Sequence, residues 1–249
     1  MKRLSAALIL TFAPLAAMAS GGAVHLEHAD IDLTDQAAMQ RGAKYFMSYC
    51  SGCHSLKYSR YNRMGRDLGL TEEQVRDNLI FTAGTKVGQN IEVALRGRDG
   101  EAWFGTAIPD LSLVTRNKKG GADWLYTYLK SFYLDDERPY GVNNTVFPDV
   151  GMPDVLWQLR GTQKAVYTEA TDAAGHPLKV FERLEQVSPG AMSPEQFDAM
   201  VRDLTTFLAY IGDPVRLERE SLGIYVILFL VVFSVLAYLL KKEYWRDVH

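Results

Sequence analysis

Residues 50–54 of this 249-residue chain read Cys-Ser-Gly-Cys-His. Two thiols at this spacing lie about one helical turn apart, so each can add to one vinyl group of the same porphyrin. The His that follows then lies under the iron and supplies its proximal nitrogen. The chain has no other cysteine, so no thiol is left for a disulfide. The pattern predicts one covalently attached haem c, held by Cys50, Cys53 and His54.

Two other kinds of Cys-x-x-Cys site fit the sequence less well. A structural zinc site usually needs four ligands in two pairs, and the remaining histidines at 25, 28, 176 and 249 lack finger-like spacing. A thioredoxin-like redox pair needs a βαβ context, which the sequence does not indicate. The pair His25 and His28 is a further metal-binding pattern, but such pairs in an N-terminal region are more often inert.

The N-terminal segment reads as a secretory signal peptide over residues 1–19. It carries Lys2 and Arg3, a mostly apolar run at 6–17, and the small-x-small pattern Ala-Met-Ala at 17–19. The apolar run is too short to span a membrane. Since c-type haem is attached on the outer side of the bacterial cytoplasmic membrane, the signal peptide and the haem motif support each other.

A second apolar segment lies near the C-terminus. Residues 223–240, GIYVILFLVVFSVLAYLL, contain no charge and would extend about 27 Å as a helix, close to the hydrocarbon thickness of a bilayer. With the signal peptide setting the orientation, we expect a single-pass protein of the bacterial inner membrane, with its haem domain in the periplasm and its C-terminus in the cytoplasm. The predicted organisation is a signal peptide at 1–19, a periplasmic haem domain at 20–215, a linker at 216–222, a transmembrane helix at 223–240 and a cytoplasmic tail at 241–249.

Between the two ends, the pattern is mostly helical with long loops. Gly42 and Phe46, one turn apart on the first helix, indicate the close approach of another helix. Gly- and Pro-rich stretches at 84–122 and 135–161 read as loops, and strand-like pieces over 166–184 around a Gly-His-Pro turn predict a small hairpin. Amphipathic spacing and capping residues predict helices over 34–49, from 71 toward 81, over 123–134 and over 193–212. We therefore expect a mostly α, cytochrome c-like haem domain with a C-terminal membrane anchor.

The residues leave several candidates for the sixth iron ligand. A methionine there raises the potential and suits electron transfer, whereas an open site suits gas binding or peroxide chemistry. Met152 lies in a Val-Gly-Met-Pro loop and Met192 in a Pro-Gly-Ala-Met segment just before a helix, and both remain candidates. A histidine, His176 or one of the N-terminal pair, is a third alternative. The other methionines, Met39, Met47, Met64 and Met200, fit packing or lie too close to His54.

Several blocks of sequence stand in a fixed order: RG at 41–42, YCSGCHSLKY at 49–58, WFGTAIPDLSL at 103–113, GADWLYTYL at 121–129, NNTVFP at 143–148 and GMP at 151–153, followed by the single anchor. Together they resemble the cytochrome c1 family, the haem subunits of ubiquinol–cytochrome c reductase (bc1) complexes. The resemblance implies that Met152 is the distal ligand, that Arg116 faces a haem propionate and that Pro109 lines the haem pocket. Ile108 departs from the family pattern, which usually has a proline there.

The resemblance implies a one-electron carrier and not an enzyme on its own. It would accept an electron from the Rieske iron–sulfur protein and pass it to a soluble or tethered c-type cytochrome, while quinol oxidation belongs to cytochrome b. The family's complex is a dimer, and we expect no nucleic-acid partner. Three alternatives remain: a membrane-anchored monohaem cytochrome feeding an oxidase or a nitrogen-oxide reductase, a haem sensor or peroxidase, and a zinc-binding module.

Overall fold

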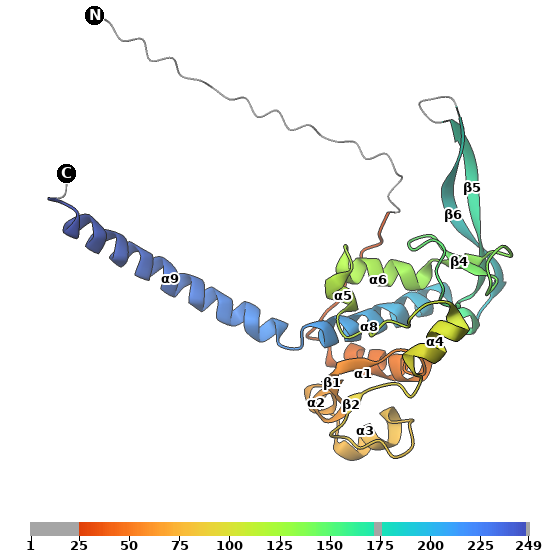
Figure 1. Cartoon of the computed structure of the whole chain (residues 1–249), viewed down its shortest axis with the longest axis horizontal. Helices are drawn as coiled ribbons and strands as arrows, with labels where there is room; N and C mark the ends of the chain where they lie inside the picture. The colour runs from red at the N-terminus through yellow and green to blue at the C-terminus, as the bar shows by residue number, and fades with distance from the viewer. Residues whose placement is uncertain (1–24, 172–175, 248–249) are drawn as a thin grey trace, which may run out of the picture.

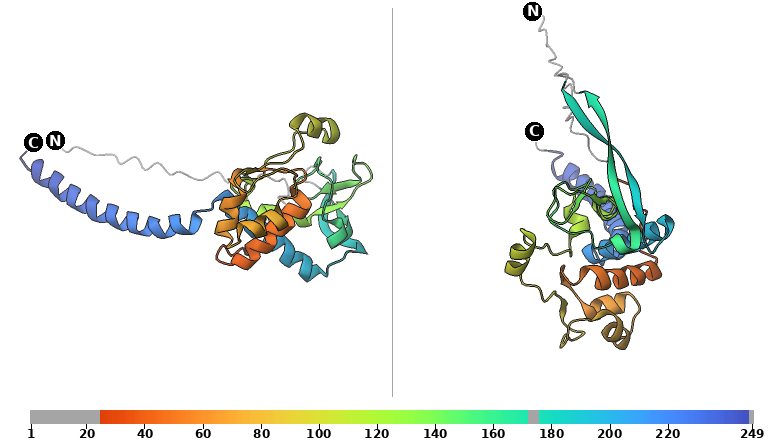
Figure 2. Two further views of the ribbon diagram at one scale, coloured as in Figure 1. Left: turned by 90° about the horizontal axis from the view of Figure 1, so that it is seen from below. Right: turned by 90° about the vertical axis from the view of Figure 1, so that its right-hand side faces the viewer.

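The computed structural model of the chain describes residues 25–171 and 176–247. The signal peptide predicted at 1–19 therefore lies outside the described residues. Figure 1 shows a helical domain from which two elements project, the hairpin β5–β6 and the long helix α9. The two views of Figure 2 show that both projections stand clear of the packed helices.

The regular elements are mostly helices, and the mostly α prediction is confirmed. Each strand of the described residues pairs with one antiparallel partner, in the pairs β1–β2, β3–β4 and β5–β6. The helices are α1 (Gln36–Tyr45), the π-helix η1 (Phe46–Cys50), α2 (Tyr61–Asp67), α3 (Glu72–Leu79), α4 (Gly97–Phe104), α5 (Val114–Asn117), α6 (Gly121–Lys130), α7 (Trp157–Arg160), α8 (Pro194–Gly212) and α9 (Arg216–Tyr244). The strands are β1 (Leu56–Arg60), β2 (Asn90–Ile91), β3 (Phe132–Leu134), β4 (Val142–Asn144), β5 (Gly161–Thr171) and β6 (Pro177–Pro189).

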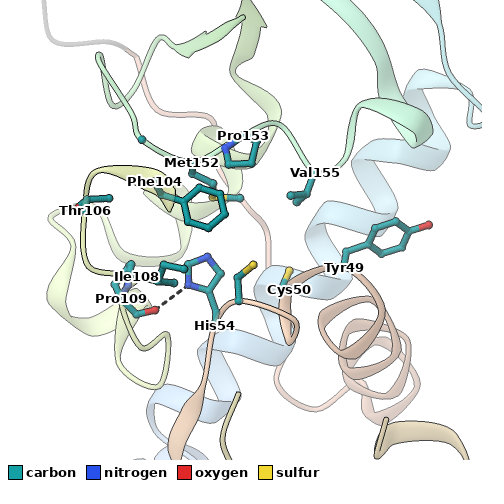
Figure 3. Close-up of a pocket in the computed structure, with 12 residues that line it drawn as sticks. Tyr49, Cys50, His54, Phe104, Thr106, Ile108, Pro109, Met152, Pro153 and Val155 are labelled. Atoms are coloured by element: carbon teal, nitrogen blue, oxygen red, sulfur yellow. Dashed lines mark hydrogen bonds between the residues drawn. The ribbon is translucent and has the colours of Figure 1, made fainter. Parts of the chain in front are cut away.

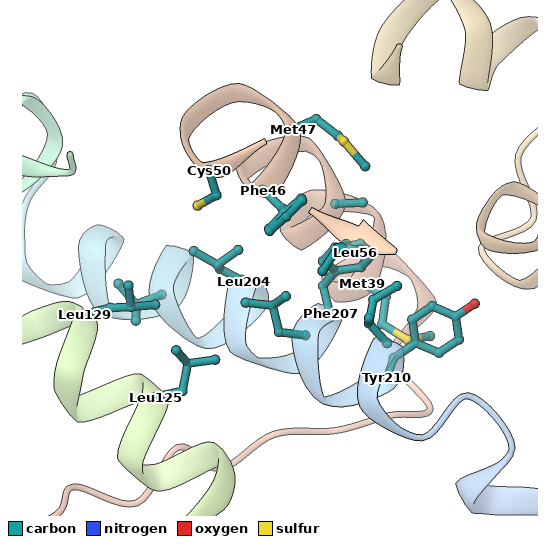
Figure 4. Packing of buried hydrophobic residues seen from close by; sticks show 14 of the residues in the cluster. Met39, Phe46, Met47, Cys50, Leu56, Leu125, Leu129, Leu204, Phe207 and Tyr210 are labelled. Atoms are coloured by element: carbon teal, nitrogen blue, oxygen red, sulfur yellow. The ribbon is translucent and has the colours of Figure 1, made fainter. Parts of the chain in front are cut away.

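Helix α8 forms the centre of the domain, between α1 and α6 (Figure 1). Its apolar stripe is buried, as the sequence pattern predicted, and Ser193 with Gln196 forms the predicted capping box around Pro194. Figure 4 shows side chains of α8 packed between those of α1 and α6. Because α8 contacts helices from both halves of the chain, it joins the segment that carries the Cys-x-x-Cys-His motif to the segment around α6.

Helices α1 and α8 approach each other most closely at Gly42. A Cβ atom at this position would lie 2.2 Å from the carbonyl oxygen of Asp203 and 2.6 Å from the Cβ of Phe207. One turn later, the rings of Phe46 and Phe207 lie 5.9 Å apart between centroids. Only glycine permits this backbone contact, which is the close helix approach that Gly42 and Phe46 indicated.

Two predicted elements differ from the structure in extent. The helix expected over 123–134 ends at Lys130, and Phe132–Leu134 instead pairs with Val142–Asn144 as β3 and β4. The small hairpin expected over 166–184 is longer, with β5 and β6 paired from Gly161 opposite Pro189. Residues 172–175, which hold part of the expected turn, lie outside the described residues.

The segment 216–222, expected to be a linker, is the first part of helix α9. The physical reason is local, because these residues include neither Gly nor Pro and the i,i+4 pair of Arg216 and Glu220 stabilises the first turns. Only residues 213–215 separate the end of α8 from the start of α9. Helix α9 is long and apolar enough to cross a membrane, and its side chains are exposed along its length.

Candidate haem site

The Cys-x-x-Cys-His segment follows directly from the widened turn η1. The N–H groups of Cys53 and His54 both donate to the carbonyl of Cys50, at 3.1 and 2.9 Å. The hydroxyl of Ser51 donates to the carbonyl of Met47 at 2.7 Å and secures the preceding turn. This compact turn places both thiols beside the imidazole at one cleft. Single π-helical turns of this kind occur frequently at functional sites.

The imidazole of His54 has a defined tautomer. Its Nδ1 lies 2.8 Å from the carbonyl oxygen of Pro109, and because a carbonyl can only accept, Nδ1 carries the hydrogen. Burial lowers the pKa of His54 despite the opposing effects of Pro109 and of Asp110, so the ring is neutral at pH 7. Its Nε2 therefore keeps a free lone pair, which is the state that a metal ligand needs.

Asp110 fixes the loop that carries the Pro109 carbonyl. Its carboxylate accepts hydrogen bonds from the backbone N–H groups of Lys57 and Ser112, both at 2.9 Å. The N–H of Leu111 donates to the carbonyl of Ser55 at 2.9 Å. The loop is thereby attached to β1, which follows the haem motif directly.

The cleft above His54 consists of two adjoining cavities of about 540 and 1010 Å³, counted out to their open sides. Figure 3 shows His54 on one side of the cleft and Met152 on the other. The walls are mainly apolar, as cofactor sites usually are. The residues shared by both cavities are Cys50, His54, Thr106, Pro109, Gly151 and Met152.

The Met152 loop is held by a buried ion pair. The guanidinium of Arg160 lies 2.5 Å from the carboxylate of Asp154, and both side chains are at most one-tenth exposed. The same guanidinium donates to the carbonyl of Lys130. Pro153 lies between Met152 and the ion pair, and its ring restricts the φ angle of the backbone there. The loop therefore presents the thioether from a stiff segment.

These groups fit a covalently bound haem. The two thiols would attach it, the neutral imidazole and the thioether would serve as iron ligands, and the apolar walls would enclose the porphyrin. The fit rests on the donor set and on the arrangement of His54 and Met152 across one cleft.

A model of the cytochrome c1 family matches residues 28–248. The chain belongs to this family. It is 55% identical to cytochrome c1 of Allochromatium vinosum over 249 residues, which cover all of both chains. It is 44% identical to the ammonia monooxygenase gamma subunit of Nitrosomonas europaea over 242 residues, 97% of each chain. Cytochrome c1 of Cereibacter sphaeroides is 26% identical over 98% of this chain and 95% of its own.

Membership of the cytochrome c1 family confirms the predicted family, fold class and cofactor. Its members carry one covalently bound haem c and serve as electron-transfer subunits of bc1 complexes. A C-terminal helix anchors the bacterial members in the membrane, and α9 is the corresponding candidate span among the described residues.

The structure places Met152, but not Met192, among the residues that line the cleft. Met192 is partly buried against the core, and its N–H donates to the carbonyl of Leu159 at 3.0 Å. Pro109 lines both cavities. The assignment of Met152 as the distal ligand and of Pro109 as a haem contact stays a prediction, which this arrangement favours.

Arg116 has a different neighbour from the one expected. Its guanidinium lies 2.9 Å from the carboxylate of Asp213, which also pairs with Arg219 at 2.6 Å. In the described part of the chain, Arg116 lines a separate polar cavity near the start of α9. Its contact with a propionate stays a prediction.

The sequence did not predict that α6 and the residues just before it contribute side chains to the cleft. Lys118, Trp124 and Tyr128 line the larger cavity, with the Lys118 ammonium 4.6 Å from the centroid of the Trp124 ring. Tyr128 also contacts Met152 through its hydroxyl. Aromatic residues at helical spacing read as ordinary core, so the sequence held no specific signal for this role.

Proposed function

We propose that this chain is the haem c subunit of a bc1 complex and accepts one electron from the Rieske iron–sulfur protein. It then passes the electron to a soluble or tethered c-type cytochrome. The observation that carries the proposal is that Cys50, Cys53, His54 and Met152 line one cleft, with His54 and Met152 on opposite sides of it (Figure 3). When bound, the haem supplies the one-electron couple.

The residues of the chain would then have separate roles. Cys50 and Cys53 hold the cofactor covalently, so it stays in one orientation toward both redox partners. His54 binds through Nε2 because its Nδ1 hydrogen is used by Pro109. Met152 supplies a thioether, which favours the reduced iron. Retaining both ligands in both redox states keeps the structural change for each electron small.

The assembly that supports this role is also part of the proposal. Helix α9 would cross the membrane beside cytochrome b, which carries out quinol oxidation, with the haem domain in the periplasm and the C-terminus in the cytoplasm. The complex would be dimeric. We transfer the cytochrome c1 role rather than the ammonia monooxygenase name to this chain because the former relative has the higher identity over its whole length.

An optical redox titration of the purified membrane complex, with its subunits identified, tests this function. We expect a low-spin haem c on this chain that does not bind carbon monoxide when reduced, together with cytochrome b and a Rieske protein. A haem that binds carbon monoxide would favour a sensor or peroxidase. A low-spin haem that copurifies with an oxidase or a nitrogen-oxide reductase would favour the other anchored cytochromes.

The charge of the exposed domain gives a test of the electron acceptor. Residues 4–240 contain 22 Lys and Arg against 28 Asp and Glu, a net charge of −6. An acidic domain attracts a basic partner over long range. Electron transfer to a basic soluble cytochrome should therefore slow as salt rises. A rate that does not respond to salt would remove the electrostatic support for a basic acceptor.

A further inference from the structure

The hydroxyl of Tyr128 contacts the sulfur of Met152. The distance between Oη and Sδ is 3.3 Å, and because a thioether can only accept, the phenol donates. The two residues come from different elements, Tyr128 from α6 and Met152 from the loop before α7. Their contact is therefore a product of the tertiary fold.

The ring of Tyr128 is fixed on several sides. It stacks on Trp124 with centroids 4.9 Å apart and an interplanar angle of 10°. It meets the edge of Phe132 at 5.2 Å and 68°. The backbone carbonyl of Tyr128 accepts a hydrogen bond from the buried Asn144 amide at 2.8 Å. The hydroxyl is thus held in place with little further loss of side-chain entropy.

A buried hydroxyl normally has a hydrogen-bond partner. Tyr128 is 9% exposed, and within the described residues its hydroxyl is paired with the Met152 sulfur. A phenylalanine would make the same ring contacts with Trp124 and Phe132. Packing therefore accounts for the ring at this position but not for the hydroxyl.

We propose that Tyr128 raises the redox potential of the haem by donating a hydrogen bond to its thioether ligand. The proposal rests on the proposed function, since it requires Met152 on the iron. A thioether sulfur has two lone pairs, so one can face the metal while the other accepts from Tyr128. The hydrogen bond withdraws electron density from sulfur, which weakens donation to ferric iron more than to ferrous iron. Partners of this kind tune metal ligands throughout metalloproteins.

The test compares Tyr128→Phe with Tyr126→Phe in the intact complex. Tyr126 is the matched control because it lies on the same helix and is buried, and its hydroxyl contacts Lys130 at 3.3 Å. We expect Tyr128→Phe to lower the ratio of reduced to oxidised haem at a fixed ambient potential by about threefold to tenfold. A tenfold change corresponds to ~59 mV for a one-electron couple. Tyr126→Phe should leave the ratio unchanged.

Spectroscopy separates failure of this proposal from failure of the ligand assignment. The ferric sulfur-to-iron charge-transfer band should be present in the wild type and in Tyr128→Phe, and absent in Met152→Ala. An unchanged potential in Tyr128→Phe with this band retained would overturn the tuning role and leave Met152 as the ligand. Loss of the band in Tyr128→Phe would show a packing role and also overturn the proposal.

A measurement on the wild type keeps the proposal testable if Tyr128→Phe does not assemble. A hydrogen bond to the sulfur predicts that the iron–sulfur stretching frequency shifts when the complex is equilibrated in D₂O. The absence of a shift would contradict the proposal. A wild-type protein without the charge-transfer band would remove the ligand assignment and, with it, the role of Tyr128.

Discussion

The Nδ1 hydrogen of His54 is bonded to the carbonyl oxygen of Pro109 across 55 residues of sequence. This bond joins the haem-binding motif to the loop at 108–112. It fixes both the tautomer and the plane of the imidazole, and it makes the ring a stronger donor through Nε2. The loop would thus act on the predicted iron ligand through this hydrogen bond.

Replacing Asp110 should disturb this bond. We expect Asp110→Ala to free the Pro109 carbonyl, since the carboxylate no longer accepts from Lys57 and Ser112. The imidazole would then donate less strongly, and the potential should rise by an amount on the order of 59 mV, which is a tenfold change in a one-electron equilibrium. Redox titration measures the change in potential, and electron paramagnetic resonance measures the weaker donation by the imidazole. Asp110→Asn keeps one acceptor oxygen and should have a smaller effect on the potential. If both variants have the same potential as the wild type, this role of Asp110 is contradicted.

Removal of the thioether should open the iron. We expect Met152→Ala to lower the potential on the order of 100 mV or more, within the ~0.8 V range that axial ligands span, and to allow carbon monoxide to bind the reduced haem. Met192→Ala is the control, because Met192 packs against the core and outside the cleft. If Met192→Ala opens the iron and Met152→Ala does not, the ligand assignment is wrong.

A methyl group at Gly42 should separate α1 from α8. The added carbon would lie within 2.2 Å of a backbone oxygen, so the helices must move apart. Overpacking of this kind costs about 1–3 kcal/mol, and chemical unfolding monitored by helix signal measures it. Gly97→Ala provides the comparison, because a Cβ at Gly97 meets nothing within 4 Å. Equal stability of the two variants would exclude the close contact.

The buried pair of Asp154 and Arg160 should be sensitive to the loss of one partner. Arg160→Met leaves the carboxylate uncompensated, which costs about 3–5 kcal/mol in buried pairs. The double variant with Asp154→Leu should regain most of that loss, because an apolar pair needs no compensation. Chemical unfolding of the single and double variants measures the loss of stability and its recovery. A double variant less stable than Arg160→Met would contradict this account.

Acid should weaken the contact between helix α6 and residues 25–33, which precede α1. Burial opposes ionisation of Asp123, but hydrogen bonds from the Ala29 N–H and from His28 outweigh it and hold the pKa of the carboxyl below 3.8. A carboxyl with a lowered folded pKa stabilises the fold above pH 3.8, and this contribution is lost as pH falls through the lowered value. Hydrogen exchange of residues 25–33 should therefore rise in acid. Asp123→Ala should show the same rise at pH 7, and protection that is insensitive to pH and to this change would count against the contact.

The parts of the molecule that the sequence predicted have strong local signals. The Cys-x-x-Cys-His spacing, the capping box at Ser193 and the glycine at 42 each correspond to a specific local geometry. The boundary of α6 was wrong because three-residue strands such as Phe132–Leu134 have no measurable period, and pairing with Val142–Asn144 decides their conformation.

The parts that the sequence did not predict depend on distant contacts. The π-helix η1 at Phe46–Cys50 has the composition of an ordinary α-helix. The bond of Tyr128 to Met152 and the ion pair of Arg116 with Asp213 join residues of different elements. A single sequence gives the type of each side chain but not the neighbour that the fold brings to it.

The short junction at 213–215 restricts where the redox centre can travel. Leu204 and Leu208 of α8 line the haem cleft, and α9 begins almost at once after that helix. Asp213 accepts from both Arg116 and Arg219, which stiffens the connection. With α9 spanning a membrane, this stiff junction would hold the haem cleft at a nearly constant height above the lipid surface. Long-distance travel between electron donor and acceptor would then have to be made by the partner proteins.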